Sequence, residues 1–364
     1  MEIKQRLLSL DAFRGLTMFL LTAEAARLYS AFGNFNPDGF LELLLGQFHH
    51  HPWHGLRFWD LIQPFFMFIV GVAMPFSYLS RLKKGQTQNQ ILKHIVKRCI
   101  ILLFLGVLLH CIHSKAVVWE LWNVLSQLSV TILIAFFLMR FSLTKQLIAS
   151  LSLVLITDLL YRFFPLEGFN NPWVMGQNFG SWMDMVLMGK INSDGWVAIN
   201  AIPSAAHTIW GVMAGQILLN SWENKKKLNY LITAGIIFLM LGYALDFTGI
   251  SLIIKRICSM AFIFASGGWA LLVLSLFFWL VDIKNIKNWT VYFVLFGTNP
   301  IFIYYFSLTI GEQWFNEVIY IFTSASLGNI LSEHWVLLCN ALAVLGLESL
   351  LLLWMYRNKI LIKI

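Results

Sequence analysis

The chain has 364 residues, of which 59% are hydrophobic and only 12% are charged, and its mean hydropathy is +0.72. A soluble domain is typically about one quarter charged, so this composition excludes an ordinary soluble protein and predicts a polytopic integral membrane protein. The formal net charge of +8 does not indicate a nucleic-acid partner, because Lys and Arg in a membrane protein mark the cytoplasmic loops.

Apolar stretches close to the length that crosses a bilayer recur along the whole chain. They predict an all-α integral membrane bundle of about 10 transmembrane helices, in one domain that covers 1–364. No internal repeat, low-complexity run or separate soluble domain is visible. The expected spans are 10–30, 58–80, 95–113, 123–139, 146–163, 197–219, 229–247, 257–281, 289–308 and 335–356.

The distribution of basic residues predicts the orientation of these spans. With the N-terminus in the cytoplasm, most of the 26 Lys and Arg residues fall on the cytoplasmic side, including Lys4, Arg6, Lys363 and the clusters at 81–98 and 225–227. This asymmetry predicts that both termini are cytoplasmic. Acids and aromatic residues on the opposite side suit a polar, sugar-like ligand, although an interfacial aromatic belt has the same composition. The three loops expected there are about 31–57, 164–196 and 309–333.

The first span carries charges within its apolar run. Asp11 and Arg14 are three residues apart, so they share one helical face and can pair, and Glu24 and Arg27 repeat this spacing. Charges within a span normally face the bundle interior or a wet cavity. The pairs are therefore either structural ion pairs or, for Glu24 near the outer loop, part of a ligand site.

A cluster of histidines precedes the second span. A neutral imidazole near pH 7 can take a proton from an incoming nucleophile, which favours a catalytic or ligand-binding site. A metal site is a weaker interpretation, because the irregular loop lacks helical i, i+4 spacing and offers no Cys or obvious carboxylate ligand. A third interpretation is that the histidines form a purely interfacial polar cluster. Asp60 can orient a histidine or pair with Arg57. The histidines are His49, His50, His51 and His54.

Two further segments combine polar residues with helix breakers. His207 lies in a run of small residues, 200–218, that permits close helix approach, and Pro203 is expected to break that helix locally. Asn299 lies beside Gly297 and Pro300 in a second expected break. Both segments either line a pathway through the membrane or are kinks needed for packing. Other polar residues expected within spans are His110, Asp158, Asp246 and Glu348.

Several motifs in order resemble one known family. SLDAFRGLTMF (9–19), HHPWHGLRFWDLIQPFFMFIVGVAMPFS (50–77) and the segment 180–215 are similar to the transmembrane acyltransferases related to heparan-α-glucosaminide N-acetyltransferase. IIKRICSMAFIFASGG (253–268), FGTNPIF (296–302) and the closing YRNKILIKI (356–364) resemble later segments of that family. The similarity covers nearly the whole chain. The lysosomal enzyme has an additional luminal domain and one more span, so the resemblance favours a bacterial branch of the family, in which Glu24 also fits.

The resemblance implies transfer of acetyl from cytosolic acetyl-CoA to the amino group of a terminal glucosamine across the membrane. The essential histidine of the HxxWxG pattern falls on His50, the Asp of DLxxP on Asp60 and the Asn of the late GxN pattern on Asn299. As substrate-binding candidates we take Glu24, Trp53, His54 and His207. As cofactor-binding candidates we take Arg14 and Lys255, and no metal is expected.

The expected function is therefore a membrane acetyltransferase of the bacterial inner membrane, in contact with lipid and capable of forming a homodimer. His50 acts either as a general base or as an acetylated nucleophile. One alternative is a transporter for amino sugars or cell-wall sugars, which broken helices and mid-membrane polar residues also suit. Another is an acyltransferase that modifies a hydroxyl of an envelope polysaccharide.

Overall fold

The structure is a computed structural model and describes residues 7–35 and 38–362, so Lys4, Arg6 and Lys363 lie outside the described residues. Every regular element in these ranges is a helix, and a single antiparallel bridge joins His54 to Ile254. The predicted all-α class is confirmed.

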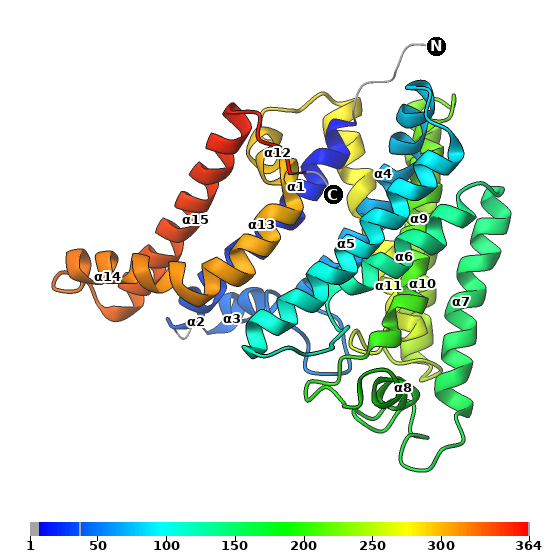
Figure 1. Cartoon of the computed structure of the whole chain (residues 1–364), viewed down its shortest axis with the longest axis horizontal. Coiled ribbons are helices and arrows are strands. Elements are labelled where there is room, and N and C mark those ends of the chain that lie inside the picture. The colour runs from blue at the N-terminus through cyan, green and yellow to red at the C-terminus, as the bar shows by residue number, and fades with distance from the viewer. Residues whose placement is uncertain (1–6, 36–37, 363–364) are drawn as a thin grey trace. The chain divides into compact units, whose positions relative to one another are not determined.

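The helices vary greatly in length, and short helices are interspersed with long ones along the chain (Figure 1). Short 3-10 turns start two of the segments and π-helical turns extend two others. In chain order the α-helices are α1 (Leu8–Ala25), α2 (Leu28–Gly33), α3 (Gly39–Gly46), α4 (Ile62–Lys83), α5 (Gln88–Ser114), α6 (Val124–Leu138), α7 (Leu143–Phe163), α8 (Phe179–Met188), α9 (Ala201–Leu219), α10 (Asn224–Phe247), α11 (Met260–Phe277), α12 (Thr290–Thr298), α13 (Pro300–Phe306), α14 (Asn316–Leu327) and α15 (Glu333–Arg357). The 3-10 turns are η1 (Phe58–Leu61) and η2 (Ala198–Asn200), and the π-helical turns are η3 (Phe278–Ile283) and η4 (Ser307–Phe315).

The chain forms two compact units. Unit 1 contains residues 1–50, 57–59 and 277–364, and unit 2 contains residues 51–56 and 60–276. The loop between α3 and η1 therefore contributes to both units, and the chain passes from unit 1 to unit 2 directly after His50.

Helix α9 is the centre of unit 2. It packs against α4, α6 and α7, and most of its residues are buried. Gly71 on α4 and Gly211 on α9 permit this packing, because a Cβ on Gly71 would overlap the carbonyl oxygen of Thr208 and one on Gly211 would overlap that of Phe68. The predicted close approach of the segment 200–218 is confirmed, and it follows the small-residue packing of membrane helices.

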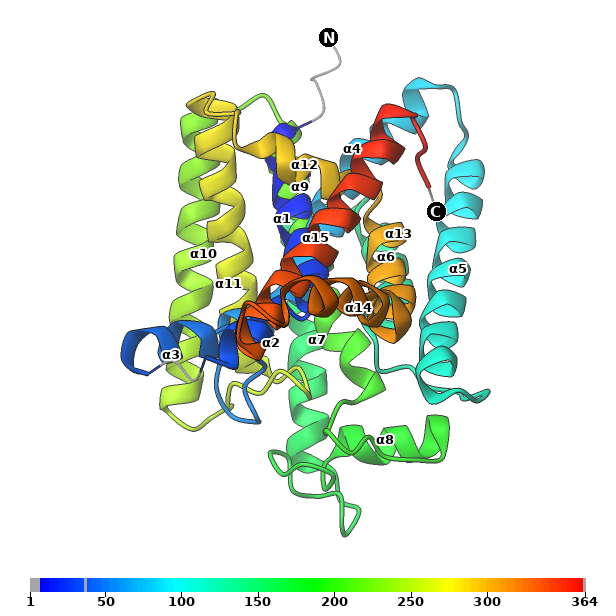
Figure 2. The ribbon, with the colours of Figure 1, turned by 90° about the vertical axis from the view of Figure 1, so that its left-hand side faces the viewer.

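Helices α10 and α11 lie side by side in unit 2 (Figure 2), with Gly242 of α10 directly against the backbone of Ala265 on α11. Large apolar side chains point away from the bundle on α5 and α10, including Ile100, Phe104 and Met240, each more than 60% exposed. A soluble helix turns such side chains inward. Their exposure is typical of surfaces that face lipid.

Unit 1 is built on the contact of α1 with α12, where Gly15 lies against the backbone of Phe293. Helix α15 packs against α14, α12 and the short helix α2. Arg14 forms an ion pair with Asp11 on the same helix, as their spacing predicts. Arg27 pairs with Glu317, 290 positions later, at 2.9 Å between Nη1 and Oε1.

Six helical segments within the described residues are long and apolar enough to cross a membrane, and a seventh exists if the bent pair 290–298 and 300–327 counts as one span. The other three predicted spans coincide with α1, α6 and α9, of 18, 15 and 19 residues. The count of about 10 spans and the cytoplasmic termini remain predictions. The six segments are Phe58–Lys83, Gln88–Ser114, Leu143–Phe163, Asn224–Phe247, Met260–Ile283 and Glu333–Arg357.

The two expected helix breaks have opposite outcomes. The break at Pro203 is wrong: α9 starts at Ala201, so Pro203 lies in its first turn, where its missing N–H removes no helical hydrogen bond. The break at Asn299 is confirmed, because α12 ends at Thr298, α13 starts at Pro300 and the chain bends there by 78°.

Candidate functional site

The part of the histidine loop in unit 2, residues 51–56, is held against the loop that precedes α11. The backbone N–H of Gly55 donates to the carbonyl of Ile253 at 2.9 Å, and His54 pairs with Ile254 in the antiparallel bridge. Gly55 has a φ of 138°, and a Cβ there would lie 2.6 Å from Nε2 of His51. Only glycine fits this turn without displacing the imidazole.

Asp60 lies in the 3-10 turn Phe58–Leu61 at the start of α4 and is 1% exposed. Its Oδ2 accepts a hydrogen bond of 3.2 Å from the backbone N–H of His51, and its Oδ1 lies 3.7 Å from Nζ of Lys255, which is also buried. The sequence allowed Asp60 to orient a histidine or to pair with Arg57. In unit 2 it binds the backbone of a histidine and a lysine distant in sequence.

Lys255 and its neighbour Arg256 share an aromatic surface. The Lys255 ammonium lies 5.2 Å from the ring centroid of Trp196, and the Arg256 guanidinium lies 5.8 Å from it. The carbonyl of Arg256 accepts from Nδ2 of Asn200 at 2.7 Å, and its side chain donates to the carbonyl of Asp194. The loop before α11 is thus tied to the segment before α9, which places one cation next to Asp60.

His54 forms a second imidazole–carboxylate contact. Its Nε2 lies 2.8 Å from Oδ1 of Asp246, at the end of α10, and the same oxygen accepts from the backbone N–H of Ile253 at 2.7 Å. The side chain of His54 is 47% exposed. A carboxylate that binds one ring nitrogen holds the ring and its tautomer, so His54 is oriented and also accessible to solvent.

Trp53, a predicted substrate-binding residue, takes part in packing. Its indole Nε1 donates to the carbonyl of Trp173 at 2.7 Å, and its ring packs against a buried cluster. The cluster consists of Tyr161, Phe179, Val197, Ile254 and Ile257. Trp53 therefore anchors the histidine loop to the segment 164–196.

Asp184 on α8 is fully buried and joins three segments of unit 2. Its Oδ2 accepts from the indole Nε1 of Trp122 at 2.7 Å, and its Oδ1 accepts from the backbone N–H of Ala198 at 2.8 Å. Burial raises the pKa of Asp184 to about 6, although both hydrogen bonds act in the opposite direction. The segment before α9 is therefore held by a carboxyl group that titrates in a mildly acidic range.

His207 is buried completely between α9 and α11. Its Nε2 lies 2.8 Å from Oγ of Ser266, and its ring makes an edge contact with Trp210, with centroids 6.0 Å apart. Its predicted substrate contact stays a prediction.

The remaining candidates lie in unit 1. His50 is half-buried, and its carbonyl accepts from Nη1 of Arg57 at 3.2 Å. Arg14 is engaged with Asp11. Glu24 is exposed on α1. Each predicted role stays a prediction.

Asn299 occupies the bend between α12 and α13 and is fully buried. Its Nδ2 donates to the carbonyl of Ile360 at 2.9 Å, and its Oδ1 accepts from the N–H of Ile362 at 2.8 Å. Both ends of the carboxamide hold the segment after α15. An oxyanion contact from Nδ2 would therefore require that segment to move.

Asp246 and Trp196, which contact candidate residues in unit 2, were not themselves among the predicted site residues. Asp246 stood out in the sequence only as a costly acid at the end of a span, and its partner His54 is 192 positions away. Trp196 carried no signal beyond its aromatic ring. Within the described ranges, no group of three or more His, Cys, Asp or Glu side chains is arranged to hold a metal ion.

Comparisons with known proteins find similarity over part of the chain. A family model described as a domain of unknown function, DUF5009, matches residues 6–178, just under half of the chain. Heparan-alpha-glucosaminide N-acetyltransferase of Mus musculus is 32% identical over 104 residues, and that of Homo sapiens is 30% identical over 104 residues.

Each of these alignments covers 29% of this chain and 14% of the relative, so the chain matches about one seventh of the length of these curated proteins. This partial similarity suggests an acyltransferase-like function. Together with the apolar helices, it points to an integral membrane protein with some likeness to membrane N-acetyltransferases.

Proposed function

We propose that this protein is a membrane acetyltransferase that moves acetyl from cytosolic acetyl-CoA to the amino group of a glucosamine-type sugar on the opposite face. The observation that carries the proposal is the acid–base environment of the histidine loop, where Asp60 binds the backbone of His51 and Asp246 binds the ring of His54. The partial similarity to two N-acetyltransferases supports the same chemistry.

The reaction requires a neutral amine. An ammonium has no free electron pair, so a base must remove a proton before the nitrogen attacks the acetyl carbonyl. We assign this role to His50. The N–C bond forms as the C–S bond breaks, and the proton held by the imidazole passes to the CoA thiolate. If His50 were acetylated first, an imidazole N–C bond would form as the C–S bond breaks and CoA leaves, and that bond would then break as the amine attacks the acetyl carbon.

Asp60 suits a positioning role at the acceptor side, and Lys255 suits contact with the acetyl donor. Asp60 is oriented by the His51 backbone, and Lys255 is held between that carboxylate and the ring of Trp196. A buried ammonium stabilises negative charge nearby more strongly than it would in water. In this proposal Lys255 interacts with the thioester end of acetyl-CoA and Arg14 with its phosphates, while His54 and Glu24 contact the sugar.

Electrostatic attraction of acetyl-CoA is assigned to the basic cytoplasmic segments 81–98 and 225–227. Lys225 and Lys226 are exposed and can contribute to it, whereas Lys227 is buried with its Nζ bonded to the carbonyl of Leu218 at 2.9 Å. The proposed location is a bacterial inner membrane, and a homodimer is compatible with this function.

The test is transfer of radiolabelled acetyl from acetyl-CoA to glucosamine acceptors by the purified protein in detergent. We expect His50→Ala to abolish transfer while the bound fraction of CoA is unchanged. His49→Ala is the matched control, because His49 is the exposed neighbour and carries the same imidazole. Full activity of His50→Ala would refute the assignment of the base to His50. So would a loss of activity in His54→Ala that His50→Ala does not show.

A second candidate is transport of an amino sugar. The bend of 78° between α12 and α13 favours it, because discontinuous helices line the binding sites of many transporters. Binding of CoA separates the two functions: an acetyltransferase binds CoA in detergent, whereas a sugar transporter does not need to. Uptake of glucosamine into proteoliposomes without acetyl-CoA would establish the transporter.

A further inference from the structure

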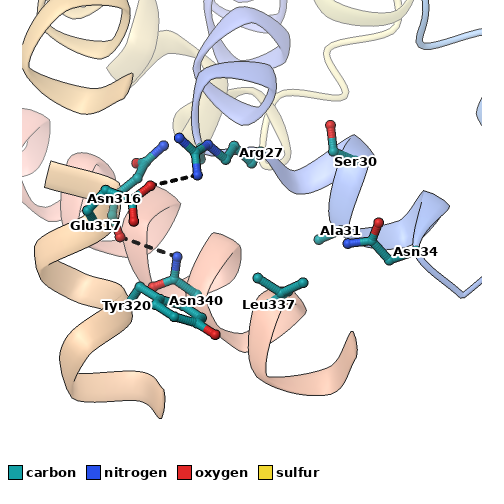
Figure 3. A pocket seen from close by; sticks show the side chains of 10 residues that line it. Arg27, Ser30, Ala31, Asn34, Asn316, Glu317, Tyr320, Leu337 and Asn340 are labelled. Atoms are coloured by element: carbon teal, nitrogen blue, oxygen red, sulfur yellow. Dashed lines mark hydrogen bonds and ion pairs between the residues drawn. The ribbon is translucent and has the colours of Figure 1, made fainter. Parts of the chain in front are cut away.

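Unit 1 contains a pocket of about 260 Å³ between α2, α14 and α15 that none of the functions above uses (Figure 3). Its walls carry one ion pair, several uncharged polar groups and apolar surface. The lining residues are Ala26, Arg27, Ser30, Ala31, Asn34, Asn316, Glu317, Tyr320, Leu337 and Asn340.

The charges in the pocket compensate each other. Nη1 of Arg27 donates to Oε1 of Glu317 at 2.9 Å, as Figure 3 shows, and both side chains are more than half exposed. Arg27 has a φ of 62°, the left-handed region that a non-glycine residue rarely adopts. The turn between α1 and α2 thus holds the guanidinium next to α14. With no net charge, the lining gives little attraction to a free anion or cation.

Uncharged hydrogen-bonding groups dominate the rest of the lining. Ser30 and Asn34 come from the α2 side, and Asn316, Tyr320 and Asn340 come from the opposite side (Figure 3). These groups offer both donors and acceptors. Leu337, Ala26 and Ala31 add apolar surface on which C–H groups can pack. Hydroxyls arranged around a ring with C–H faces, as in a sugar, match such a lining.

The side chain of Asn316 indicates which hydrogen-bonding group a ligand of this pocket must offer. It is 1% exposed, and its Nδ2 donates to the carbonyl of Ala25 at 2.8 Å, which identifies the other atom of the carboxamide as oxygen. This Oδ1 has no hydrogen-bond partner among the described residues. A buried acceptor without a donor costs free energy. A ligand hydroxyl that reaches it removes this cost, whereas a phosphate oxygen offers no donor.

The predicted topology places the pocket on one side of the membrane. If both termini are cytoplasmic, the C-terminal end of α1 and the N-terminal end of α15 lie on the opposite side of the membrane. The residues that line the pocket follow α1 or belong to the N-terminal halves of α14 and α15. Glycans and lipid-linked sugars are the ring-shaped polyhydroxyl compounds present on that side of a cell membrane.

We propose that this pocket binds one uncharged sugar ring, either as a free monosaccharide or as a unit of a longer glycan. The carboxamides of Asn34 and Asn316 bond to its hydroxyls, and Leu337 packs against its C–H face. The site is independent of the proposed acetyl transfer, because it needs neither an amine nor acetyl-CoA.

The test is equilibrium binding of radiolabelled methyl glucoside to the purified full-length protein in nanodiscs. This sugar lacks an amine, so binding to it does not depend on the acetyltransferase proposal, and His50→Ala is expected to bind it normally. Asn34→Ala should weaken binding about fivefold, because one hydrogen bond is lost. Asn34 is exposed, so this variant should fold, and Asn316→Leu tests the buried acceptor.

Ser324→Ala, on α14 outside the pocket, is the matched control and should bind as the wild type does. Stronger binding of a short oligosaccharide than of methyl glucoside would identify a glycan as the natural source, and equal binding a free sugar. No saturable binding of methyl glucoside, or binding unchanged in both asparagine variants, would overturn the proposal. So would binding of phosphocholine in the pocket in place of the sugar.

Discussion

The carboxylate cluster of unit 2, formed by Asp60, Lys255, Asp246 and His54, differs from the pocket of unit 1 in how its charges are exposed. Asp60 and Lys255 are 1% and 7% exposed, whereas Arg27 and Glu317 are 56% and 58% exposed. Buried charges tie loops together and are costly to separate, and exposed charges contribute little to stability. Stability should therefore depend on the carboxylate cluster, and the unit 1 pocket should tolerate substitution.

The largest expected effect is that of Asp60→Asn. It removes the carboxylate charge 3.7 Å from the buried Lys255 ammonium, and breaking a buried ion pair by removing one partner typically costs about 3–5 kcal/mol. Denaturant unfolding in detergent measures the loss. The double variant Asp60→Asn, Lys255→Met should recover most of it, because no unpaired charge then remains. If the single and double variants were equally unstable, the ion pair would not be the cause.

Asp184 should make the stability of unit 2 depend on pH. Because its pKa is raised from 3.8 to about 6, the stability that protonated Asp184 contributes is fully present below about pH 4 and is lost as the pH rises through 6. A shift of two units corresponds to about 3 kcal/mol. Asp184→Asn has no such titration, so its stability relative to the wild type should improve by about that amount between pH 4 and pH 7.

Thermal unfolding at pH 4, 5.5 and 7 measures this difference. Asp194→Asn is the control, because Asp194 is an exposed acid ten residues further along the chain. If wild type and Asp184→Asn kept a constant difference across this range, Asp184 would not titrate there.

Close helix contact in unit 2 should be sensitive to one methyl group. Gly71→Ala places a Cβ against the carbonyl of Thr208 and should destabilise the α4–α9 contact by about 1–3 kcal/mol, the usual cost of overpacking. Gly346→Ala on α15, where a Cβ meets nothing within 4 Å, is the control and should be neutral or slightly stabilising. Equal effects of the two substitutions in thermal unfolding would contradict this packing.

The smallest expected effects are those of the exposed ion pairs. Arg27→Ala in the unit 1 pocket and His54→Ala in the carboxylate cluster should each change the free energy of unfolding by about 1 kcal/mol or less. A loss in Arg27→Ala as large as that in Asp60→Asn would remove the contrast between the two regions. Unfolding at low and high salt provides the check, because exposed pairs are screened.

The two expected helix breaks show the limit of local patterns. Pro203 and Pro300 both lie in apolar segments that also contain small and polar residues, so the sequence predicted a helix break at each. Pro203 lies in a first helical turn and causes no break, because the preceding 3-10 turn ends directly before α9. At Pro300 a helix stops and another starts, because Asn299 is bonded to Ile360 and Ile362, some 60 residues away.

The sequence by itself determined the helical class, the membrane character and the Asp11–Arg14 ion pair, because hydrophobic length and i, i+3 spacing are local properties. It also singled out the histidine loop and Asp60. Only the tertiary structure decided the partners: Lys255 for Asp60, Asp246 for His54 and Glu317 for Arg27. These residues lie some 190 to 290 positions apart. Their pairing depends on which loops meet after the helices pack, and no local pattern encodes that meeting.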